Sequence, residues 1–466
     1  MTRTVLPMTN IDILVKELRA TLRGEVTAPG DARYDSARRV WNGLIDRRPA
    51  VIARCADTAD VVEAVRLARE HPIDVSIRGG GHQVAGSAVV DDALVIDLST
   101  MTSVHVDPER RIARVAGGAR WRDVDRATQL FGLATTGGEV SVTGVAGLTL
   151  GGGMGLLQRA FGLACDNLRS VEIVTADGVV RRASADEHTD LFWAARGAGR
   201  GIGVVTSFEF DLRPLGPEVA AAWVVYLAEQ ARSVAAAFRE LALAAPDTVS
   251  PELMFWAVPP DPEIPEELHG RPVVMALGMF AGDPADAGPV LAPFAELGEP
   301  LLDLSGVMPY AELQRSADEL VPDGNRYYFK SHFADSLDDG ALDALVRSFE
   351  ERANVESLIA VRTLGGAIDR VSPDDSAYPH RNRRFNVSFD AGWTHPTDDR
   401  ACLGWARGSW TAFQPYATGG VYMNFAGFEG ETDVTTADIF GTRTQLARTR
   451  EAYDPHGLFA GAAARP

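Results

Sequence analysis

Three glycine-rich stretches in the first half of the chain constrain its fold more than any other feature. They are residues 78–87, 143–155 and 196–203, with the sequences RGGGHQVAGS, TGVAGLTLGGGMG and RGAGRGIG. Glycine lets the backbone adopt positive φ and approach a ligand closely, because no Cβ stands in the way. Successive N–H groups in such loops form concave sites for anions such as pyrophosphate. The three stretches together favour nucleotide binding, although a single one is as often a plain turn.

The spacing of these glycines excludes the two commonest nucleotide-binding loops. The first stretch follows a predicted strand but lacks the G-x-G-x-x-G spacing of a Rossmann fold, and the second has no clear strand before it. No G-x-x-x-x-G-K-[ST] sequence occurs, so there is no P-loop. A nucleotide would therefore be held by a different loop design.

The composition is that of an acidic globular protein of two or more domains. A chain of 466 residues exceeds the size at which a single hydrophobic core stops growing. The formal net charge of -19 repels phosphate backbones, so we expect no nucleic-acid partner. Cys55, Cys165 and Cys402 are far apart and form no CxxC pair. Neither a disulfide framework nor a metal site is therefore expected.

The N-terminal segment predicts a short amphipathic helix, with Ile13, Leu14, Leu18 and Leu22 on one face. It lacks the continuous apolar core and the small-residue cleavage site of a signal peptide. No apolar run approaches the roughly 20 residues that span a bilayer. We therefore expect a cytoplasmic protein with no membrane partner.

Helices mixed with locally paired strands predict an α+β fold. Residues 170–184 are predicted to form a hairpin, whose Asp177-Gly178 pair suits a type I′ turn. After Pro214 the glycine clusters become sparse, and a helix over 231–244 and an apolar strand over 273–280 are predicted. This change in glycine content and in predicted elements indicates a second domain.

Four motifs in consistent order resemble a family of flavoproteins. Arg78–His82 is similar to the R-S-G-G-H loop of the berberine-bridge-enzyme-like oxidases, with Gly79 in place of the usual serine. These oxidases belong to the vanillyl-alcohol oxidase superfamily. The stretches GVAGLTLGGGMGLLQRAFGLACDNL and DLFWAARGAGRGIGVVTSFEF, and the tail AYDPHGLF, resemble the family's other signatures.

The resemblance implies the architecture of the vanillyl-alcohol oxidase type. Residues 1–214 and 416–466 would form a two-part FAD-binding domain. Residues 215–415 would form an inserted substrate domain, built on an antiparallel sheet covered by helices.

The resemblance also implies that FAD is attached by two covalent bonds, from His82 to the flavin 8α carbon and from Cys165 to flavin C6. An unlinked thiol remains the alternative for Cys165, because many family members link only once. Further FAD-binding residues are implied in the glycine loops and the C-terminal segment. They are Arg78, Gly79, Gly80, Gly81, Gln83, Ser87, Gly144, Gly147, Gly151, Gly152, Val205 and Asn424.

The segment GVYMNF resembles the Y-x-N-Y segment of family members that oxidise alcohols. It makes Tyr422 the candidate catalytic base, with Phe425 in place of the second tyrosine. An unperturbed tyrosine, with a pKa of about 10, is a poor base at neutral pH. A nearby cation or hydrogen-bond donor must lower that pKa, and Arg381 and Arg362 are the candidates. Other residues considered for the substrate pocket, with ordinary core or surface roles as the alternative, are Trp256, Tyr327, Tyr328, Phe329 and His380.

These features predict an FAD-dependent oxidase that acts on a C–OH or C–N bond of a small molecule, with molecular oxygen as acceptor. A dehydrogenase with another acceptor is the first alternative, favoured slightly by Leu168, which resembles a position near the oxygen-facing side of the flavin. A flavin-containing protein that sequesters a small molecule without turnover is the second. The sequence does not indicate the substrate or the oligomeric state.

Overall fold

The N-terminal part is built on two sheets in the computed structural model, which describes residues 9–259, 264–428, 431, 434–441 and 444–459. The first sheet has the order β1-β2-β4-β3, with β1 antiparallel to β2 and the other pairs parallel. Two helices pack together over it and share its apolar core. The elements are α1 (Asn10–Thr21), β1 (Glu25–Thr27), β2 (Val51–Arg54), α3 (Thr58–Glu70), β3 (Val75–Arg78) and β4 (Leu94–Asp97).

The second sheet is antiparallel, with the order β5-β6-β10-β8-β9. Its strands are β5 (Val104–Asp107), β6 (Ile112–Ala116), β8 (Leu168–Val174), β9 (Val180–Ser184) and β10 (Val204–Asp211). Four helices lie in the loops around it: α4 (Trp121–Thr128), α5 (Val145–Leu150), α6 (Gln158–Phe161) and α7 (Thr189–Ala195). Smaller elements of this part are α2 (Tyr34–Ala37) and the pair β7 (Leu133–Ala134) and β11 (Arg213–Pro214).

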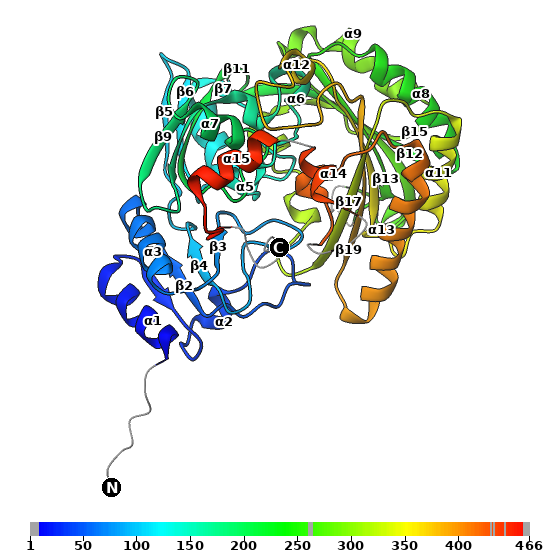
Figure 1. Ribbon diagram of the computed structural model, residues 1–466. Coiled ribbons are helices and arrows are strands. Elements are labelled where there is room, and N and C mark those ends of the chain that lie inside the picture. Colours follow the sequence, from blue (N-terminus) through cyan, green and yellow to red (C-terminus); the bar gives the residue numbers. More distant parts are fainter. Residues whose placement is uncertain (1–8, 260–263, 429–430, 432–433, 442–443, 460–466) are drawn as a thin grey trace.

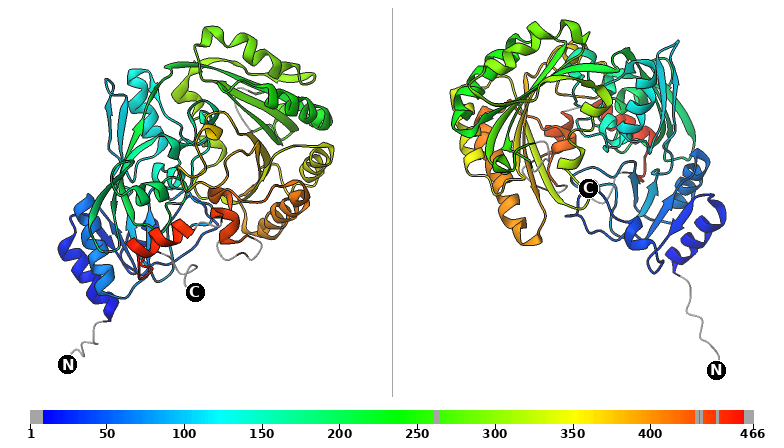
Figure 2. Two further views of the ribbon diagram at one scale, coloured as in Figure 1. Left: turned by 45° about the horizontal axis from the view of Figure 1, so that its top comes forward. Right: turned by 180° about the vertical axis from the view of Figure 1, so that it is seen from behind.

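The region after Pro214 contains one large antiparallel sheet, with the order β15-β12-β14-β13-β18-β19-β17 and with β16 also paired to β12. Its strands are β12 (Glu218–Leu227), β13 (Val249–Ala257), β14 (Pro272–Phe280), β15 (Pro300–Asp303), β16 (Gly306–Pro309), β17 (Arg326–Ala334), β18 (Leu358–Thr363) and β19 (Phe385–Trp393). The longest helices cover its outer face (Figures 1 and 2): α8 (Ala231–Ala244), α11 (Asp339–Glu350) and α13 (Asp399–Phe413). Shorter helices are α9 (Gly288–Leu291), α10 (Tyr310–Leu313) and α12 (Ala367–Arg370).

Alternation along the strands gives this sheet two different faces. On β13, Leu253 and Phe255 point into the core shared with the helices. Their neighbours Glu252, Met254 and Trp256 line a cavity on the opposite face. Helix α8 matches the first face, because its buried residues recur at helical spacing. The helices therefore leave the other face of the sheet available to a ligand.

The C-terminal segment returns to the N-terminal part (Figure 1). Helix α14 (Thr436–Phe440) follows this return, and α15 (Thr444–Tyr453) packs against α7. The carbonyl of Tyr453 accepts a hydrogen bond from Ala176 N, and Arg450 donates to the carbonyl of Arg200. The last seven residues of the predicted 416–466 segment lie outside the described residues. The division at 214 and 415 stays a prediction, whereas the α+β architecture of two domains is confirmed.

One local prediction is wrong in detail. The hairpin of β8 and β9 forms, but only Gly178 of the Asp177-Gly178 pair has positive φ, at 79°. A type I′ turn requires positive φ at both central residues. The amide of Gly178 instead donates to the carbonyl of Thr175. This hydrogen bond closes a type I turn, and Gly178 is the left-handed residue that follows the two central positions. Among the described residues, no helix is both long and apolar enough to cross a membrane.

Candidate active site

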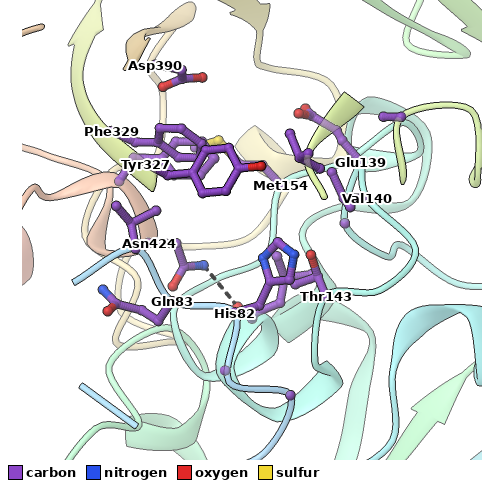
Figure 3. A pocket seen from close by; sticks show the side chains of 18 of the residues that line it. His82, Gln83, Glu139, Val140, Thr143, Met154, Tyr327, Phe329, Asp390 and Asn424 are labelled. Carbon is purple, nitrogen blue, oxygen red and sulfur yellow. Dashed lines mark hydrogen bonds between the residues drawn. The ribbon is translucent and has the colours of Figure 1, made fainter. Parts of the chain in front are cut away.

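A cavity of about 1340 Å³ lies between the glycine loops and the uncovered face of the large sheet. This exceeds the roughly 300–1,000 Å³ of an ordinary ligand pocket and leaves room for a dinucleotide together with a small substrate. Figure 3 shows His82, Gln83 and Asn424 on one side of it and Asp390 on the other, with Tyr327 and Phe329 between them. The predicted residues that line the cavity are Gly79, Gly80, Gly81, His82, Gln83, Ser87, Gly144, Gly147, Val205, Tyr422 and Asn424.

The first two glycine loops lie against each other at this cavity. A Cβ added to Gly80 would stand 2.5 Å from Gly144 Cα, and one added to Gly144 would stand 2.5 Å from Gly80 N. Both residues must therefore be glycine for the loops to meet. Gly81 has a φ of 67°, which also favours glycine. This arrangement presents exposed backbone to the cavity, as pyrophosphate binding requires.

Apart from Cys165, three of the predicted FAD-binding residues do not line the cavity. The guanidinium of Arg78 is buried beneath the first loop, where it pairs with Asp97 and donates to the carbonyl of Ala37. Gly151 and Gly152 instead accommodate the C-terminal segment. A Cβ on Gly151 would stand 2.3 Å from Asn424 Oδ1. These residues shape the loops, because their own groups do not face the cavity.

His82 has the properties of a cofactor-linking residue. Its ring stacks on Trp41 at 4.1 Å, and Trp41 stacks on Tyr327 at 4.0 Å. Its Nε2 atom is buried and has no hydrogen-bond partner. Burial, together with the positive charge of Arg120, lowers the pKa of His82 well below 6.5, so the imidazole is neutral. A fixed, neutral ring with an unpartnered nitrogen at a cavity fits attachment to a flavin.

Cys165 occupies a different environment. Its side chain is fully buried, and it does not belong to the cavity wall. It packs in an apolar cluster with Met154, Leu163 and Tyr378, and its thiol lies 3.7 Å from Asp166 Oδ1. Burial, and then the charge of Asp166, raise the pKa of the thiol. The structure therefore does not bring the second predicted linking residue to the cavity that His82 lines.

The hydroxyl oxygen of Tyr422 is surrounded by hydrogen-bond donors. It accepts from Gly153 N and Met154 N, each at 3.1 Å, and from Asn424 Nδ2 at 2.8 Å. Burial raises the pKa of Tyr422 to about 12, although the bonds from Met154, Asn424 and Gly153 act in the opposite direction. Asn424 also donates to the carbonyl of Leu148 at 3.3 Å. The oxygen thus anchors the second glycine loop.

The arginines expected to lower this pKa are engaged elsewhere, so that prediction is wrong. Arg381 forms a buried two-bond pair with Asp166, at 2.6 and 2.8 Å. Arg362 donates two hydrogen bonds to the carboxylate of Glu139, at 2.7 and 2.8 Å. Hydrogen-bond donors, and not a cation, surround the oxygen of Tyr422. A neutral phenol is therefore its state at neutral pH.

Some of the other candidates also lie away from the cavity. Trp256, Tyr327, Phe329 and Arg362 line it. Tyr328 lies on the other face of β17 and donates to Glu431, and His380 stacks on Phe333. Leu168 packs in the core of the second sheet and is not part of the wall. Its position therefore does not favour a dehydrogenase.

A group of charged residues at the cavity wall was not predicted from the sequence. Arg362, paired with Glu139, also lies 3.5 Å from Glu252 Oε1 and donates to Ser388 Oγ at 2.8 Å. Ser388 in turn donates to Asp390 Oδ2 at 2.9 Å. The available signal was a single charged residue within each of two strand segments, PELMFWA and FNVSFDAGW. No group of three or more His, Cys, Asp or Glu side chains in the described ranges is placed to hold a metal ion.

Known proteins resemble this chain in sequence and in fold. Residues 49–184 match a family described as FAD binding domain. The uncharacterized FAD-linked oxidoreductase YgaK of Bacillus subtilis is 29% identical over 451 residues, which are 95% of this chain and 96% of that protein. These matches confirm an FAD-binding domain and an oxidoreductase.

Solved structures confirm the fold. 6-hydroxy-D-nicotine oxidase from Arthrobacter nicotinovorans has a TM-score of 0.82 and 27% identity, with 96% of this chain and 98% of that chain covered. The BBE-like 1 protein of Physcomitrella patens has a TM-score of 0.85 and 22% identity, with 97% and 99% covered. The predicted two-domain α+β architecture is therefore shared with these two solved structures.

Proposed function

Because the chain is an FAD-linked oxidoreductase similar to the berberine-bridge-enzyme-like oxidases, we propose that it oxidises a C–OH or C–N bond of a small molecule. FAD would lie along the loops of Gly80 and Gly144, and would supply the acceptor for the substrate's hydride at flavin N5. The observation that carries the proposal is the unpartnered Nε2 of His82 at the wall of a cavity large enough for cofactor and substrate.

We propose that His82 attaches the flavin covalently. Its neutral ring, held by Trp41, supports this. The second attachment, predicted for Cys165, has no comparable support, since that thiol does not face the cavity. Acid precipitation followed by peptide mass mapping tests both links. We expect flavin mass on the peptide containing His82 and an unmodified Cys165, and His82→Ala should release the flavin into the acid supernatant. A flavin that washes out of the wild-type protein contradicts covalent attachment, and a single flavin that joins the two peptides into one cross-linked species would establish the two-link form.

Tyr422 remains our proposed base for the substrate proton. Its oxygen lies among three N–H donors, which would stabilise the phenolate that a base requires. Burial opposes that stabilisation, and at a pKa of about 12 only about one molecule in 100,000 is ionised at pH 7. A bound substrate must therefore take part in forming the active base.

Anaerobic mixing with a panel of small alcohols and amines tests the activity itself. Loss of flavin absorbance identifies a substrate, and readmission of air shows whether oxygen accepts the electrons. Rapid reoxidation supports our proposal of an oxidase, whereas reoxidation only by a quinone or dye indicates a dehydrogenase. A protein that binds compounds tightly but is never reduced by them would instead be a sequestering protein.

A further inference from the structure

The cavity wall opposite the glycine loops contains more acidic than basic groups. Glu139, Glu252 and Asp390 carry three carboxylates, and Arg362 carries the one guanidinium among them. They come from separate segments: Glu252 lies on β13, Arg362 on β18 and Asp390 on β19, whereas Glu139 lies in the loop before α5. Figure 3 shows Glu139 and Asp390 at the end of the pocket that is distant from His82. If all four groups are ionised, the wall carries two uncompensated negative charges.

The guanidinium does not satisfy all of these carboxylates. It gives two hydrogen bonds to Glu139 and reaches Asp390 only through Ser388. Asp390 Oδ1 has no hydrogen-bond partner, although the residue is only 7% exposed. Glu252 Oε1 likewise has no hydrogen bond, only the 3.5 Å ion-pair contact with Arg362. Buried polar atoms without partners are uncommon, and at a cavity wall they indicate groups that await a ligand.

The electrostatics of the wall agree with this interpretation. Burial raises the pKa of Glu252 to about 8 and the pKa of Asp390 to about 7, so the empty pocket holds protons that a cation would displace. The charge of Glu139 raises both pKa values and that of Asp390 also raises the pKa of Glu252, whereas Arg362 lowers both and Ser388 lowers that of Asp390. Trp256 and Phe329 complete the wall, and aromatic faces also attract cations.

We propose that the substrate carries a basic nitrogen that binds as a cation at this acidic wall, where Asp390 Oδ1 and Glu252 Oε1 lack hydrogen bonds. The inference rests on the proposed function only in placing the substrate in this cavity. It selects amines from the C–OH and C–N donors of the proposed function. A neutral alcohol of the same shape could donate a hydrogen bond but would not compensate the negative charge, and a carboxylate ligand would add a third uncompensated charge.

Calorimetry on the anaerobic holoenzyme, with its flavin reduced beforehand by dithionite, tests the inference without turnover, because a reduced flavin accepts no hydride. The ligands are matched pairs of benzylamine with benzyl alcohol and of naphthylmethylamine with naphthylmethanol, with benzoate as the anionic probe. We expect the amines to bind about 10- to 100-fold more tightly than the alcohols, as charge-assisted hydrogen bonds do. Amine binding should release protons at pH 7, and its affinity should rise from about pH 6 to pH 8 as the wall ionises. Equal binding of alcohols, or no binding of either amine, would overturn the inference.

Isosteric variants locate the effect. Asp390→Asn keeps an acceptor for Ser388 but removes the charge, and Glu252→Gln does the same on β13. Each should lower amine affinity about tenfold or more and leave alcohol affinity within about threefold. Asp343→Asn, on the outer surface of α11 where the carboxylate pairs with Arg232, is the matched control and should change neither affinity. Amine affinity retained in both pocket variants, with folding verified by flavin content and thermal unfolding, refutes the assignment.

The two proposals fail separately. A flavin that is reduced by neutral alcohols, with no preference for amines, would leave the oxidoreductase proposal in place and end the inference. Amines that bind through Asp390 without ever reducing the flavin would leave the inference in place and contradict the oxidoreductase proposal.

Discussion

Tyr422→Phe removes one oxygen atom and leaves three N–H donors to be satisfied. The amides of Gly153 and Met154 lose the acceptor that they have among the described residues, whereas Asn424 keeps its bond to the carbonyl of Leu148. A buried hydrogen bond contributes about 1 kcal/mol net, and an unsatisfied buried donor costs about 1–3 kcal/mol. We therefore expect the free energy of unfolding of the flavin-binding part to fall by about 2–4 kcal/mol. Denaturant titration, followed by tryptophan and flavin signals, measures this change.

Tyr226→Phe is the matched control. Tyr226 is also fully buried, but its hydroxyl has fewer donors around it: it donates to the carbonyl of Phe294 and accepts from one backbone amide, that of Leu297. Its loss should cost about 1 kcal/mol. If Tyr422→Phe lowers the free energy of unfolding by no more than this control does, the anchoring role that we assign to the three donors is wrong.

The variant Tyr422→Phe also shows whether Tyr422 acts as the catalytic base or only anchors the second glycine loop. If Tyr422 is the base, the rate of anaerobic flavin reduction should fall by about 100- to 10,000-fold. The wild-type rate with an uncharged substrate should then rise with pH, because the reactive phenolate has a pKa of about 12, and the variant should lose this dependence. A variant that is destabilised but reduces its flavin at the wild-type rate would show that Tyr422 is an anchor only.

Two further predictions concern cofactor binding and the division of the chain. Gly80→Ala should lower flavin content sharply, because its Cβ would overlap Gly144. The control Gly408→Ala has nothing within 4 Å of its added Cβ and should leave flavin content unchanged. Flavin absorbance per mole of protein measures both. A fragment of residues 1–214 should be insoluble or free of flavin, because it lacks Tyr422 and α15; a stable fragment that carries flavin would contradict the two-part FAD-binding domain.

Features that are continuous in the sequence were predicted well. The bounds of α8 agree with the predicted helix over 231–244, because Val234, Phe238 and Ala242 repeat at helical spacing. The glycine loop that contains His82 was predicted because its chemistry depends on consecutive residues. Its aromatic support was not predicted, since Trp41 lies 41 positions before His82 and nothing local connects them.

Features that depend on contacts between distant segments were missed. Cys165 was predicted to reach the flavin, yet its thiol is fully buried, and its neighbour Asp166 is paired with Arg381, which is 215 residues away in the sequence. The donors around Tyr422 lie 268 and 269 residues before it. The acidic wall arises because the registers of β13, β18 and β19 place Glu252, Arg362 and Asp390 near one another. Strand register over such separations is fixed by tertiary packing, and a single sequence does not reveal it.

The acidic wall should also make stability depend on pH. The pKa values of Glu252 and Asp390 rise on folding, from 4.5 to about 8 and from 3.8 to about 7. A carboxyl with a raised pKa holds its proton more tightly in the folded state. Its contribution to the free energy of unfolding is therefore complete below about pH 4 and is lost as the pH rises to about 8.

The decline in the free energy of unfolding should be on the order of 2–5 kcal/mol for the pair, measured by denaturant titration between about pH 5 and pH 9. The lowered pKa values of His82 and His332 act in the opposite sense but only below their ordinary value of 6.5, whereas the buried Asp125, whose pKa is raised to about 7, adds to the decline. The double variant Glu252→Gln, Asp390→Asn should therefore make the decline above pH 6.5 smaller, and saturating benzylamine should do so in the wild type. Parallel profiles for the wild type and the double variant would show that the empty pocket holds no such protons, and the electrostatic support for a cationic substrate would be lost.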